Sequence, residues 1–568
     1  MIPLHVHSYY SLLEGVISLD EIIDKSLAYN LDAIALTDTN AMHGLIPFYK
    51  KANEKGIKPI LGAYIDEPTT KETPLSFIRR GVGGEVPYAL FLAKNFEGYS
   101  DICKIITSRK LKNDFSLFRL LQEYFPNLFI ISASAELLRS VPSYDNIFAE
   151  LILTEAHRKN SLLLYELAQN RKFRYIISNP VYFSELQDFL LHKVVTAVKY
   201  RNTFENIKRE YLVDKEFYFK HPDSFLKYYK KIPEAFHNIR YIVDNCNVDL
   251  QLGKYKFPVY PNLKPACRQA GNENAFSYLW RVSYAGLEMR YNKITSAIMK
   301  RFEEELNVIN DLNLAGYFLV VWDIHREAQK RGMVTIGRGS AANSIISYCL
   351  GFTQVDPIKH NFYFERFLNK SRSSPPDIDI DFSWRERDEI IRYVFEKYGY
   401  DKVAMISTHV TMRARSAFRE VAKAFGISEQ ETNKISKRIP WTDARNLPEV
   451  SHLYPEAKSL KLDIEPWKTI VTVASRLANF PRHLSIHPGG IVIAPQKITT
   501  YTALEFAKNK GLGLIITQPD MHSIEDIGLV KIDLLSQRSL GVLRETIKQI
   551  ETNNIKLIII LPTERITE

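Results

Sequence analysis

The sequence predicts a multidomain α/β protein, and three observations support this class. Its 568 residues are about four times the ~150 residues of a typical domain, so several hydrophobic cores are expected. Near the N-terminus, short apolar segments alternate with amphipathic ones, as in β-α-β units with parallel strands. Further along, residues 375–382 alternate between acidic and apolar side chains, which is the period of a strand.

The composition indicates an ordinary globular protein. Hydrophobic residues make up 45% and charged residues 25% of the chain, without an excess of Gly or Pro, so disorder is excluded as the main state. The net charge of +10 is compatible with a polyanionic partner but does not identify one. The four cysteines form no CxxC pair, and no apolar run approaches the ~20 residues that cross a bilayer. We therefore expect a cytoplasmic protein without a membrane partner.

The first elements follow the β-α-β pattern. The apolar residues 2–6 predict a strand, and the capping box Ser18-Leu19-Asp20-Glu21 predicts a helix that continues to about residue 29. The elements expected next are a strand at 33–36, a helix at 45–55 and a strand at 59–62. Chemistry in such sheets and barrels collects at the carboxyl ends of the strands. The candidate site residues there are His5, His7 and Asp38.

A second region of this type is expected around residues 174–178. The basic, aromatic tract that follows, from Lys199 to about Arg240, is interpreted as a solvated helical face whose Lys and Arg stems cover apolar surface. Pro, Gly and Lys residues interrupt the periodicity from Leu252 to Pro265. We place the main domain boundary there.

A glycine-rich segment at residues 335–344 predicts a phosphate-binding turn. It reads Thr-Ile-Gly-Arg-Gly-Ser-Ala-Ala-Asn-Ser, follows an apolar strand and opens a helix-like run through Leu350. Backbone N–H groups and the positive end of a helix attract an anion at such a turn. The segment lacks the Gly-Lys-Ser/Thr of a Walker loop, and a tight turn without a ligand is the alternative.

The most informative segment is Pro-Pro-Asp-Ile-Asp-Ile-Asp-Phe at residues 375–382. In a strand, Asp377, Asp379 and Asp381 share one face, and their carboxylates lie roughly 6.5–7 Å apart. Such like charges repel unless cations lie among them. Oxygen ligands favour hard cations, above all Mg²⁺, and two such ions can activate an attacking hydroxyl and stabilise a leaving oxygen in phosphoryl transfer. An acidic edge strand or a structural Ca²⁺ loop is the alternative, although the Gly of a Ca²⁺ loop is missing.

Residues 528–535 predict another strand of the same kind. Lys531 and Asp533 share one face of it, while Val530, Ile532 and Leu534 form the other. Asp533 would bring a further metal-ligating carboxylate to the site. An isolated Asp on a strand usually lies on the surface, so this interpretation depends on the two preceding motifs.

Two more segments are candidates for contact with DNA. Residues 401–440 hold eight Lys and Arg against four acidic residues, and these cations either contact phosphates or form a solvated face. Residues 480–490 contain His483 and His487, but Pro488 disfavours a helix and no third ligand is near, so we expect a loop near DNA and no zinc site. The candidate DNA-binding residues are Arg413, Arg415, Arg419 and His483.

Together these motifs resemble the palm of C-family bacterial replicative DNA polymerases, the DNA polymerase III alpha subunits. The segments that carry the resemblance are residues 317–323, 337–344, 355–357, 364–369 and 376–382. The resemblance implies an N-terminal polymerase-and-histidinol-phosphatase (PHP) domain, a distorted β/α barrel, followed by a polymerase-beta-like nucleotidyltransferase palm with an inserted helical thumb. The sequences of residues 339–344 and 483–490 resemble the error-prone, damage-tolerant branch of the family more than the main replicative branch.

The resemblance also implies DNA-directed DNA polymerase activity in replication or repair. Two carboxylates of the acidic strand and Asp533 would hold two Mg²⁺; Asp377 and Asp379 are the expected pair, with Asp381 next. The primer 3′-hydroxyl would attack the α-phosphorus of a dNTP. The residues expected to bind this nucleotide are Gly337, Arg338, Gly339, Ser340 and Lys531. The expected partners are primer–template DNA, dNTPs, the remaining polymerase domains, other replisome or repair subunits and a sliding clamp.

In the PHP family, some members bind three metals and hydrolyse phosphoester bonds. Residues here that match the family's ligands are His5, His7, Glu14, Asp38 and His192. Other ligand positions are substituted: Thr39 stands where the family has His, Tyr64 where it has Glu, and Pro180 and Tyr182 where it has Asp and His. Too few ligands are left for tight binding of several metals. We therefore expect a degenerate, largely structural domain with metal absent or weakly held, and no proofreading activity.

The resemblance divides the chain into a PHP domain at 1–250, a first palm segment at 251–430, a thumb at 431–500 and a second palm segment at 501–568. This corresponds to about half of a family member and ends before the fingers, so we expect a truncated form whose closure on a nucleotide needs a partner surface. Two other functions stay open. One is a metal-dependent phosphoesterase that uses the barrel, and the other is a catalytically silent DNA-binding or assembly subunit.

Overall fold

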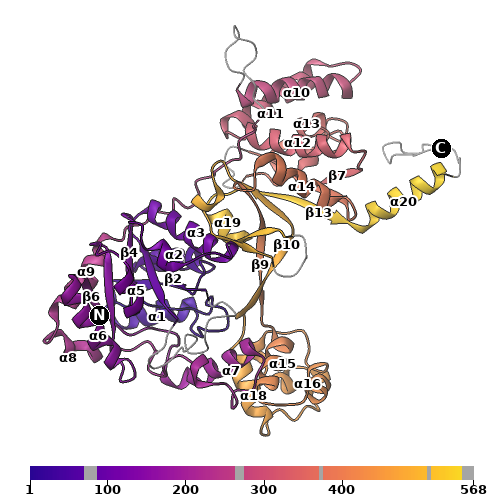
Figure 1. Ribbon diagram of the computed structural model, residues 1–568. Helices are drawn as coiled ribbons and strands as arrows, with labels where there is room; N and C mark the ends of the chain where they lie inside the picture. Colours follow the sequence, from indigo (N-terminus) through magenta and orange to yellow (C-terminus); the bar gives the residue numbers. More distant parts are fainter. Residues whose placement is uncertain (69–85, 262–273, 370–374, 508–512, 553–568) are drawn as a thin grey trace. The chain divides into compact units, whose positions relative to one another are not determined.

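The computed structural model describes residues 1–68, 86–261, 274–369, 375–507 and 513–552 (Figure 1). They form two compact units of mixed α/β structure, as predicted. Unit 1 comprises the described parts of 1–252, 407–486 and 499–527, and unit 2 comprises those of 253–406, 487–498 and 528–568. Among the helices of these ranges, none has the length and apolar character needed to cross a bilayer.

Unit 1 contains a six-stranded sheet whose strand order follows the sequence. Its strands are β1 (Ala33–Leu36), β2 (Lys58–Asp66), β3 (Tyr88–Ala93), β4 (Leu128–Ser132), β5 (Ile147–Ile152) and β6 (Arg174–Ser178). Strand β3 is antiparallel to both of its neighbours, and the other pairs are parallel. Most residues of these strands are buried, as expected for a sheet that is covered on both faces.

Residues 2–6 do not form the predicted strand. They contribute a single bridge, between Val6 and Val181. The Thr37 N–H donates to the Val6 carbonyl at 2.8 Å beyond β1, and the His7 N–H donates to the Val181 carbonyl at 2.8 Å beyond β6. Because the hydrogen bonds of this segment are divided between two neighbours, neither pairing extends into a ladder. The segment links the two ends of the sheet and curls it, in agreement with the predicted distorted barrel.

The two helices predicted for the N-terminal region, at residues 19–29 and 45–55, begin where the sequence indicates. At α1 (Leu19–Ala28), the Ser18 hydroxyl accepts the Glu21 N–H at 3.1 Å, and the Glu21 carboxylate accepts the Ser18 N–H at 2.8 Å. The helices that follow are α2 (Leu45–Glu54), α3 (Phe96–Leu111), α4 (Leu117–Leu120), α5 (Ala135–Ser140), α6 (Arg158–Arg171), α7 (Phe189–Tyr200), α8 (Leu226–Tyr229) and α9 (Pro233–Asn245).

The described parts of residues 407–486 and 499–527 add a helical group and two short strands to unit 1. The helices are α15 (Ala414–Ala424), α16 (Glu429–Ser436), α17 (Val450–Leu453), α18 (Trp467–Ser475) and α19 (Met521–Asp526), and the strands are β11 (Leu504–Phe506) and β12 (Ile515–Asp520). Helix α15 packs against α16, α18 and α7 (Figure 1). The thumb boundaries remain predictions.

Unit 2 combines helices with the strands that carry the acidic motif. The helices are α10 (Ala275–Arg290), α11 (Ser296–Asp311), α12 (Ala315–Lys330), α13 (Ile345–Cys349), α14 (Arg387–Tyr398) and α20 (Arg538–Thr552). Strands β7 (Thr335–Arg338), β8 (Asp379–Ser383) and β13 (Lys531–Gln537) lie in the order β13-β8-β7, followed beyond β13 by β10 (Pro481–Ile493). Strand β8 is parallel to β13 and antiparallel to β7, while β13 is antiparallel to β10. Strands β10 and β9 (Val403–Thr411) each pass from one unit into the other.

Candidate active site

The acidic strand has the two faces that its alternation predicts. Ile378, Ile380 and Phe382 are at most 1% exposed and form part of the core of unit 2. On the acidic side, exposure decreases along the chain. Asp377 precedes β8 and is exposed, Asp379 is half-buried, and Asp381 is buried.

One row of residues crosses the sheet at the start of β8. Arg338 of β7 lies opposite Asp379, Asp379 lies beside Asp533 of β13, and Asp533 lies opposite Gly490 of β10. Residues in register on adjacent strands project their side chains to the same face. The structure therefore brings together Arg338, Asp379 and Asp533, which the sequence identified in three separate motifs.

Two cations lie beside these carboxylates. Arg338 Nε is 3.8 Å from Asp379 Oδ2 and 3.6 Å from Asp381 Oδ1. Lys531 Nζ donates to Asp533 Oδ2 at 2.8 Å. The positive charges of Arg338 and Lys531 thus partly compensate the acidic row, and both groups are also suited to bind phosphate.

Two of the carboxylates, those of Asp379 and Asp381, have a raised pKa despite these cations. Burial raises the pKa of Asp379, and the negative charges of Asp377 and Asp533 raise it further, against the opposite effect of Arg338 and Lys531. Burial likewise raises the pKa of Asp381, against Arg338 and a hydrogen bond from Gln537. A cation among these groups would favour their charged forms.

Two carboxylate oxygens in the site have unmet hydrogen-bonding capacity. Asp381 Oδ1 and Asp533 Oδ1 are buried and accept no hydrogen bond from any described residue. The cation nearest to Asp381 Oδ1 is Arg338 Nε at 3.6 Å, and His487 Nδ1 lies 3.8 Å from Asp533 Oδ1. Buried oxygens of this kind need an explanation, and a bound ion supplies one.

These donors fit a hard divalent cation such as Mg²⁺, which prefers carboxylate oxygens and retains several waters. The described residues contain no group of three or more His, Cys, Asp or Glu side chains that is already arranged to hold a metal ion. Binding would therefore require the carboxylates to draw together around the ion. The residues that could take part are Asp377, Asp379, Asp381 and Asp533.

The glycine-rich segment continues directly from β7. It forms a 3₁₀ turn at Gly339–Asn343 and then the five-residue helix α13, instead of the continuous helix-like run that was predicted. Gly339 adopts a φ of +74°, which favours glycine, and a Cβ on Gly337 would lie 1.8 Å from the Phe352 carbonyl oxygen. Because α13 is so short, phosphate binding here would depend on turn N–H groups and on the side chains of Arg338 and Ser340.

The structure corrects the predicted loop at residues 480–490. Residues 481–490 belong to the long strand β10 (Pro481–Ile493). Proline suits extended backbone because its φ is fixed near −65°, and the loss of one N–H removes at most one ladder bond. The periodicity of this segment is weak, so the pairing with β13 could not be inferred from local sequence.

His487 lies next to the acidic row. Its Nδ1 accepts the N–H groups of Gly490 at 2.6 Å and Gly489 at 3.3 Å. A Cβ at position 490 would lie 2.7 Å from this nitrogen, so the arrangement requires glycine. The sequence analysis rejected a zinc site at His487 and placed this residue in a loop near DNA, so it did not predict the proximity of His487 to the acidic row. The His-Pro-Gly-Gly sequence was the available signal.

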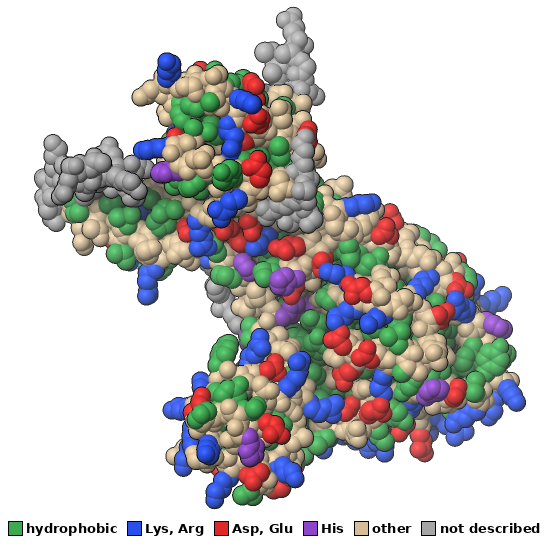
Figure 2. Space-filling view, turned by 180° about the vertical axis from the view of Figure 1, so that it is seen from behind, with side chains coloured by type: hydrophobic (Ala, Val, Ile, Leu, Met, Phe, Trp, Pro, Cys, Tyr) green, Lys and Arg blue, Asp and Glu red, His purple; other side chains and the backbone are tan. Residues whose placement is uncertain are grey.

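The predicted DNA-binding residues lie in unit 1. Arg415 and Arg419 are on the exposed side of α15, and Arg413 immediately precedes the helix, 3.7 Å from Asp443. Arg415 Nε also donates to the Ile439 carbonyl. His483 is half-buried in β10, where burial lowers its pKa. The exposed face of α15 agrees with both alternatives, phosphate contact and a solvated face. Figure 2 shows Lys and Arg interspersed with Asp and Glu on the face in view.

The predicted PHP ligands come together in unit 1, but their side chains bond to one another and to neighbours. His5 Nε2 lies 2.9 Å from His7 Nε2, and His5 Nδ1 lies 2.8 Å from Glu150 Oε1. Two nitrogens at this separation share one hydrogen bond. Nitrogens that ligate one tetrahedral zinc, each about 2.0–2.1 Å from the metal, lie farther apart.

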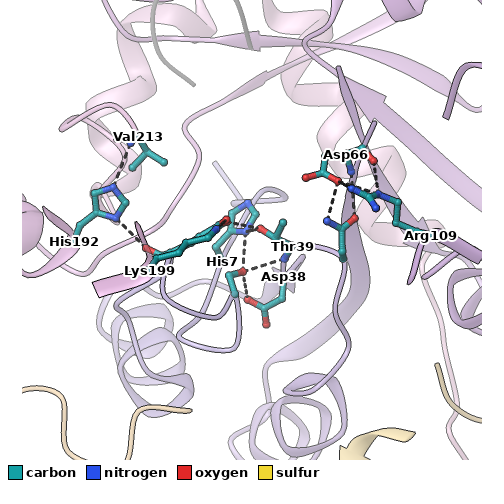
Figure 3. Close-up of polar contacts among 11 residues, drawn as sticks. His7, Asp38, Thr39, Asp66, Arg109, His192, Lys199 and Val213 are labelled. Carbon is teal, nitrogen blue, oxygen red and sulfur yellow. Dashed lines mark hydrogen bonds and ion pairs between the residues drawn. The ribbon is translucent and has the colours of Figure 1, made fainter. Parts of the chain in front are cut away.

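Asp38 and His192 are also held by hydrogen bonds (Figure 3), and so is Glu14. Asp38 accepts hydrogen bonds of 2.7–2.8 Å from the Ser8 N–H and from the Ser8 and Ser11 hydroxyls, and burial raises its pKa to about 6. The Glu14 carboxylate pairs with Lys199 and accepts the Thr39 hydroxyl at 3.0 Å, while its backbone carbonyl bonds to His192 Nδ1 at 2.9 Å.

Aromatic rings surround the histidine pair. Tyr182 stacks on His7 with centroids 4.1 Å apart, and Tyr64 meets the same ring edge-on at 5.2 Å. The Tyr88 hydroxyl donates to Glu150 at 2.7 Å. Burial raises the pKa of Glu150, but His5 and Tyr88 outweigh it and leave the pKa below its ordinary value. Glu150 and Tyr88 were not predicted; a glutamate inside the apolar run of β5 was the available signal.

Comparisons with known proteins match both regions. Residues 3–144 match the PHP domain family, and residues 277–536 match the family described as the bacterial DNA polymerase III alpha NTPase domain. An error-prone DNA polymerase of Symbiobacterium thermophilum is 33% identical over 97% of this chain and 52% of its own length. DNA polymerase III subunit alpha of Bacillus subtilis is 30% identical over 98% of this chain and 50% of its own length. The chain thus spans about half the length of these relatives.

Proposed function

Because this chain belongs to the bacterial DNA polymerase III alpha family, we propose that it catalyses template-directed transfer of a deoxynucleotide to a primer 3′-hydroxyl. The family that the motifs predicted is confirmed, and the activity of this chain is our proposal. The observation that carries it is the placement of Asp379 and Asp533 side by side on parallel strands, between Arg338 and Lys531.

In this proposal, Asp379 and Asp533 hold two Mg²⁺, and Asp377 and Asp381 are the candidates for a third carboxylate. The raised pKa of Asp379 and the unmet acceptors at Asp533 and Asp381 support this assignment. When bound, the ions would neutralise charge on the attacking and leaving oxygens. The carboxylates determine where the ions would bind. This position lies on the acidic face of the sheet, next to β7 and the glycine-rich turn.

The nucleotide would bind next to this row. Arg338 and Lys531 compensate the carboxylates in the absence of a cation, and they become free to pair with the triphosphate when ions take over that role. Gly337 and Gly339 allow the backbone to follow its turn, and Ser340 offers a hydroxyl and an N–H to a phosphate oxygen.

We further propose that primer–template DNA contacts Arg413, Arg415, Arg419 and His483. Placement in the error-prone branch is supported by the relative from Symbiobacterium thermophilum, which is an error-prone DNA polymerase. Cooperation with the remaining polymerase domains, with replisome or repair subunits and with a sliding clamp belongs to the same proposal. We assign a structural role to the PHP domain, since its histidines and carboxylates are held by hydrogen bonds and ion pairs.

Primer extension with Mg²⁺ and dNTPs tests the function, with the rest of a related polymerase supplied in trans. We expect Asp379→Asn and Asp533→Asn each to lower the rate at least about 100-fold, the scale on which loss of one charge-stabilising group acts. The matched control is Glu396→Gln, which removes one charge from an exposed site on α14 of the same unit and leaves the rate unchanged.

The same proteins are also assayed for hydrolysis of phosphate esters and for DNA binding. Extension that survives both Asp substitutions contradicts the proposed site. Ester hydrolysis that survives them and requires His5 and His7 would support the phosphoesterase instead. DNA binding without either reaction, in the presence of the complementing domains, would support the silent assembly subunit.

A further inference from the structure

A buried carboxylate on α11 faces the glycine-rich segment. Glu305 is fully buried, although it lies outside the acidic row and belongs to none of the motifs discussed above. Burying a carboxylate is costly unless hydrogen bonds and an opposite charge compensate it. Its partners therefore indicate what this side chain does.

Both oxygens of Glu305 are engaged. Arg301, one turn earlier on α11, donates from Nε to Glu305 Oε1 at 2.7 Å. The Ser344 hydroxyl donates to Oε2 at 2.7 Å, and the Ile346 N–H approaches the same oxygen at 3.4 Å. Glu305 thus connects α11 to the point where the 3₁₀ turn ends and α13 begins.

Arg301 extends this contact along the segment. Its Nη2 donates to the Asn343 carbonyl at 3.3 Å and to the Phe362 carbonyl at 3.1 Å. The Asn343 side chain in turn donates to the Ser340 carbonyl at 2.9 Å. A continuous chain of hydrogen bonds therefore runs from Glu305 to Ser340.

The other end of the segment is fixed at the acidic row. Arg338 is paired with Asp379 in the sheet register, and Gly339 turns the chain immediately afterwards. The segment from Gly339 to Ser344 is consequently held at Arg338 by the sheet and at Ser344 by Glu305. Turn N–H groups can bind phosphate without reorganisation only if both attachments persist.

We propose that Glu305, through Arg301 and Ser344, is a positioning residue that holds the Gly339–Ser344 turn ready for the triphosphate of the incoming nucleotide. This inference rests on the proposed function for the identity of the ligand. The rigidity of the turn does not depend on that function, and the two can be tested separately.

The first test compares Glu305→Gln with Glu303→Gln, an identical change at an exposed position of the same helix. Amide hydrogen exchange is measured for residues 339–346 in the nucleotide-free protein, and Mg²⁺-dependent binding of dNTPs is titrated in parallel. We expect Glu305→Gln to speed exchange in this segment selectively and to weaken dNTP binding about tenfold, the effect of losing a charge-assisted hydrogen bond. Glu303→Gln should change neither.

A second pair of variants, at Ser344, tests the same contact in case Glu305→Gln does not fold. Ser344→Ala removes the hydroxyl that reaches Glu305, whereas Ser344→Thr retains one. We expect Ser344→Ala to reproduce both effects and Ser344→Thr to restore most of the dNTP affinity. A purely structural contact would lower thermal stability without changing exchange at residues 339–346 relative to the rest of unit 2.

The outcomes separate the two proposals. Unchanged exchange at residues 339–346 in Glu305→Gln and Ser344→Ala overturns the positioning role, whatever the nucleotide affinity. Absence of dNTP binding by the unsubstituted protein, with exchange still increased in the variants, overturns the proposed ligand and leaves the rigid turn established. Weakened binding together with faster exchange supports both.

Discussion

Asp379 combines two requirements that oppose each other. It must remain ionised to attract a cation, but burial and its acidic neighbours Asp377 and Asp533 raise its pKa. The unfolded chain has an ordinary Asp pKa of about 3.9. Between that value and the higher folded pKa, the folded protein binds more protons, so stability falls as pH rises through this window and stays lower above it.

Asp379→Asn should therefore stabilise the cation-free protein at neutral pH. We expect the unfolding temperature of unit 2 to rise by roughly 2 °C at pH 7.5, as about 1 kcal/mol gives in a large domain, and by nothing below about pH 4. Thermal unfolding in a chelator, recorded across this pH range, measures the effect. Glu396→Gln serves as the control.

The corresponding result with Mg²⁺ tests the assignment of the ligand. Added Mg²⁺ should raise the unfolding temperature of the unsubstituted protein, because an ion that binds only the folded state stabilises it. The same addition should have little effect on Asp379→Asn. A variant that is less stable than the parent at pH 7.5 would contradict the electrostatic strain argued here.

Unlike two carboxylate oxygens of the acidic row, the histidines of unit 1 already have hydrogen-bond partners within the protein. His5 and His7 bond to each other, and Glu150, Tyr88 and Tyr182 surround them. We expect the purified protein to hold less than stoichiometric zinc or manganese after dialysis, measured by elemental analysis. Stoichiometric metal that is lost in His5→Ala and His7→Ala would contradict this expectation.

At the scale of elements, β10 shows how a loop-like sequence becomes a strand. Its weak periodicity and Pro488 favour a loop, but pairing with β13 places Gly490 opposite Asp533. There His487 accepts two backbone N–H groups and lies 3.8 Å from Asp533. The strand therefore places His487 beside the acidic row, and burial lowers the pKa of this histidine.

Gly490→Ala should displace the His487 ring from its position beside Asp533. The new methyl group would lie 2.7 Å from His487 Nδ1, and we expect a loss of about 1–3 kcal/mol of unfolding free energy, the usual cost of overpacking. Primer extension should fall together with stability, since the His487 ring lies next to Asp533. Chemical denaturation and extension assays measure the two effects.

Coupling with position 487 distinguishes this clash from a general effect of alanine in the strand. In a His487→Ala background, the ring that the methyl group meets is absent, so Gly490→Ala should cost less than it does alone. Equal costs in both backgrounds would show that the clash with His487 is not the reason.

The same elements show how much of the site was predictable. The strands with strict alternation, β8 and β13, were predicted with their faces because the period of side chains is a local property. Their register was not, because the neighbours Arg338, Asp379, Asp533 and Gly490 are set by pairing between distant segments. Pairing between distant segments also explains why residues 2–6 do not form the predicted strand. The roles of Glu305 and Glu150 were not predicted because their partners, Ser344 and His5, are distant in sequence.

The whole molecule consists of two units, with the candidate DNA-binding arginines in unit 1 and the acidic row in unit 2. The chain spans about half the length of its relatives. The net charge of +10 is spread over many ion pairs and mixed surface, so charge alone does not identify a DNA track. For the exposed cations of α15, two alternatives can be tested: they contact DNA phosphates, or they form a solvated face.

The salt dependence of DNA binding decides between these alternatives. Each phosphate that a protein cation neutralises adds about 0.9 to the slope of log affinity against log salt for duplex DNA. Arg415→Ala and Arg419→Ala should each reduce this slope by roughly that amount and weaken binding equally for all sequences. Arg139→Ala, at an exposed position of α5, is the matched control and should leave the slope unchanged. Fluorescence anisotropy of a primer–template from 50 to about 300 mM salt measures the slope. If it is the same in both α15 variants as in the parent protein, these arginines form a solvated face, and the DNA must be held elsewhere.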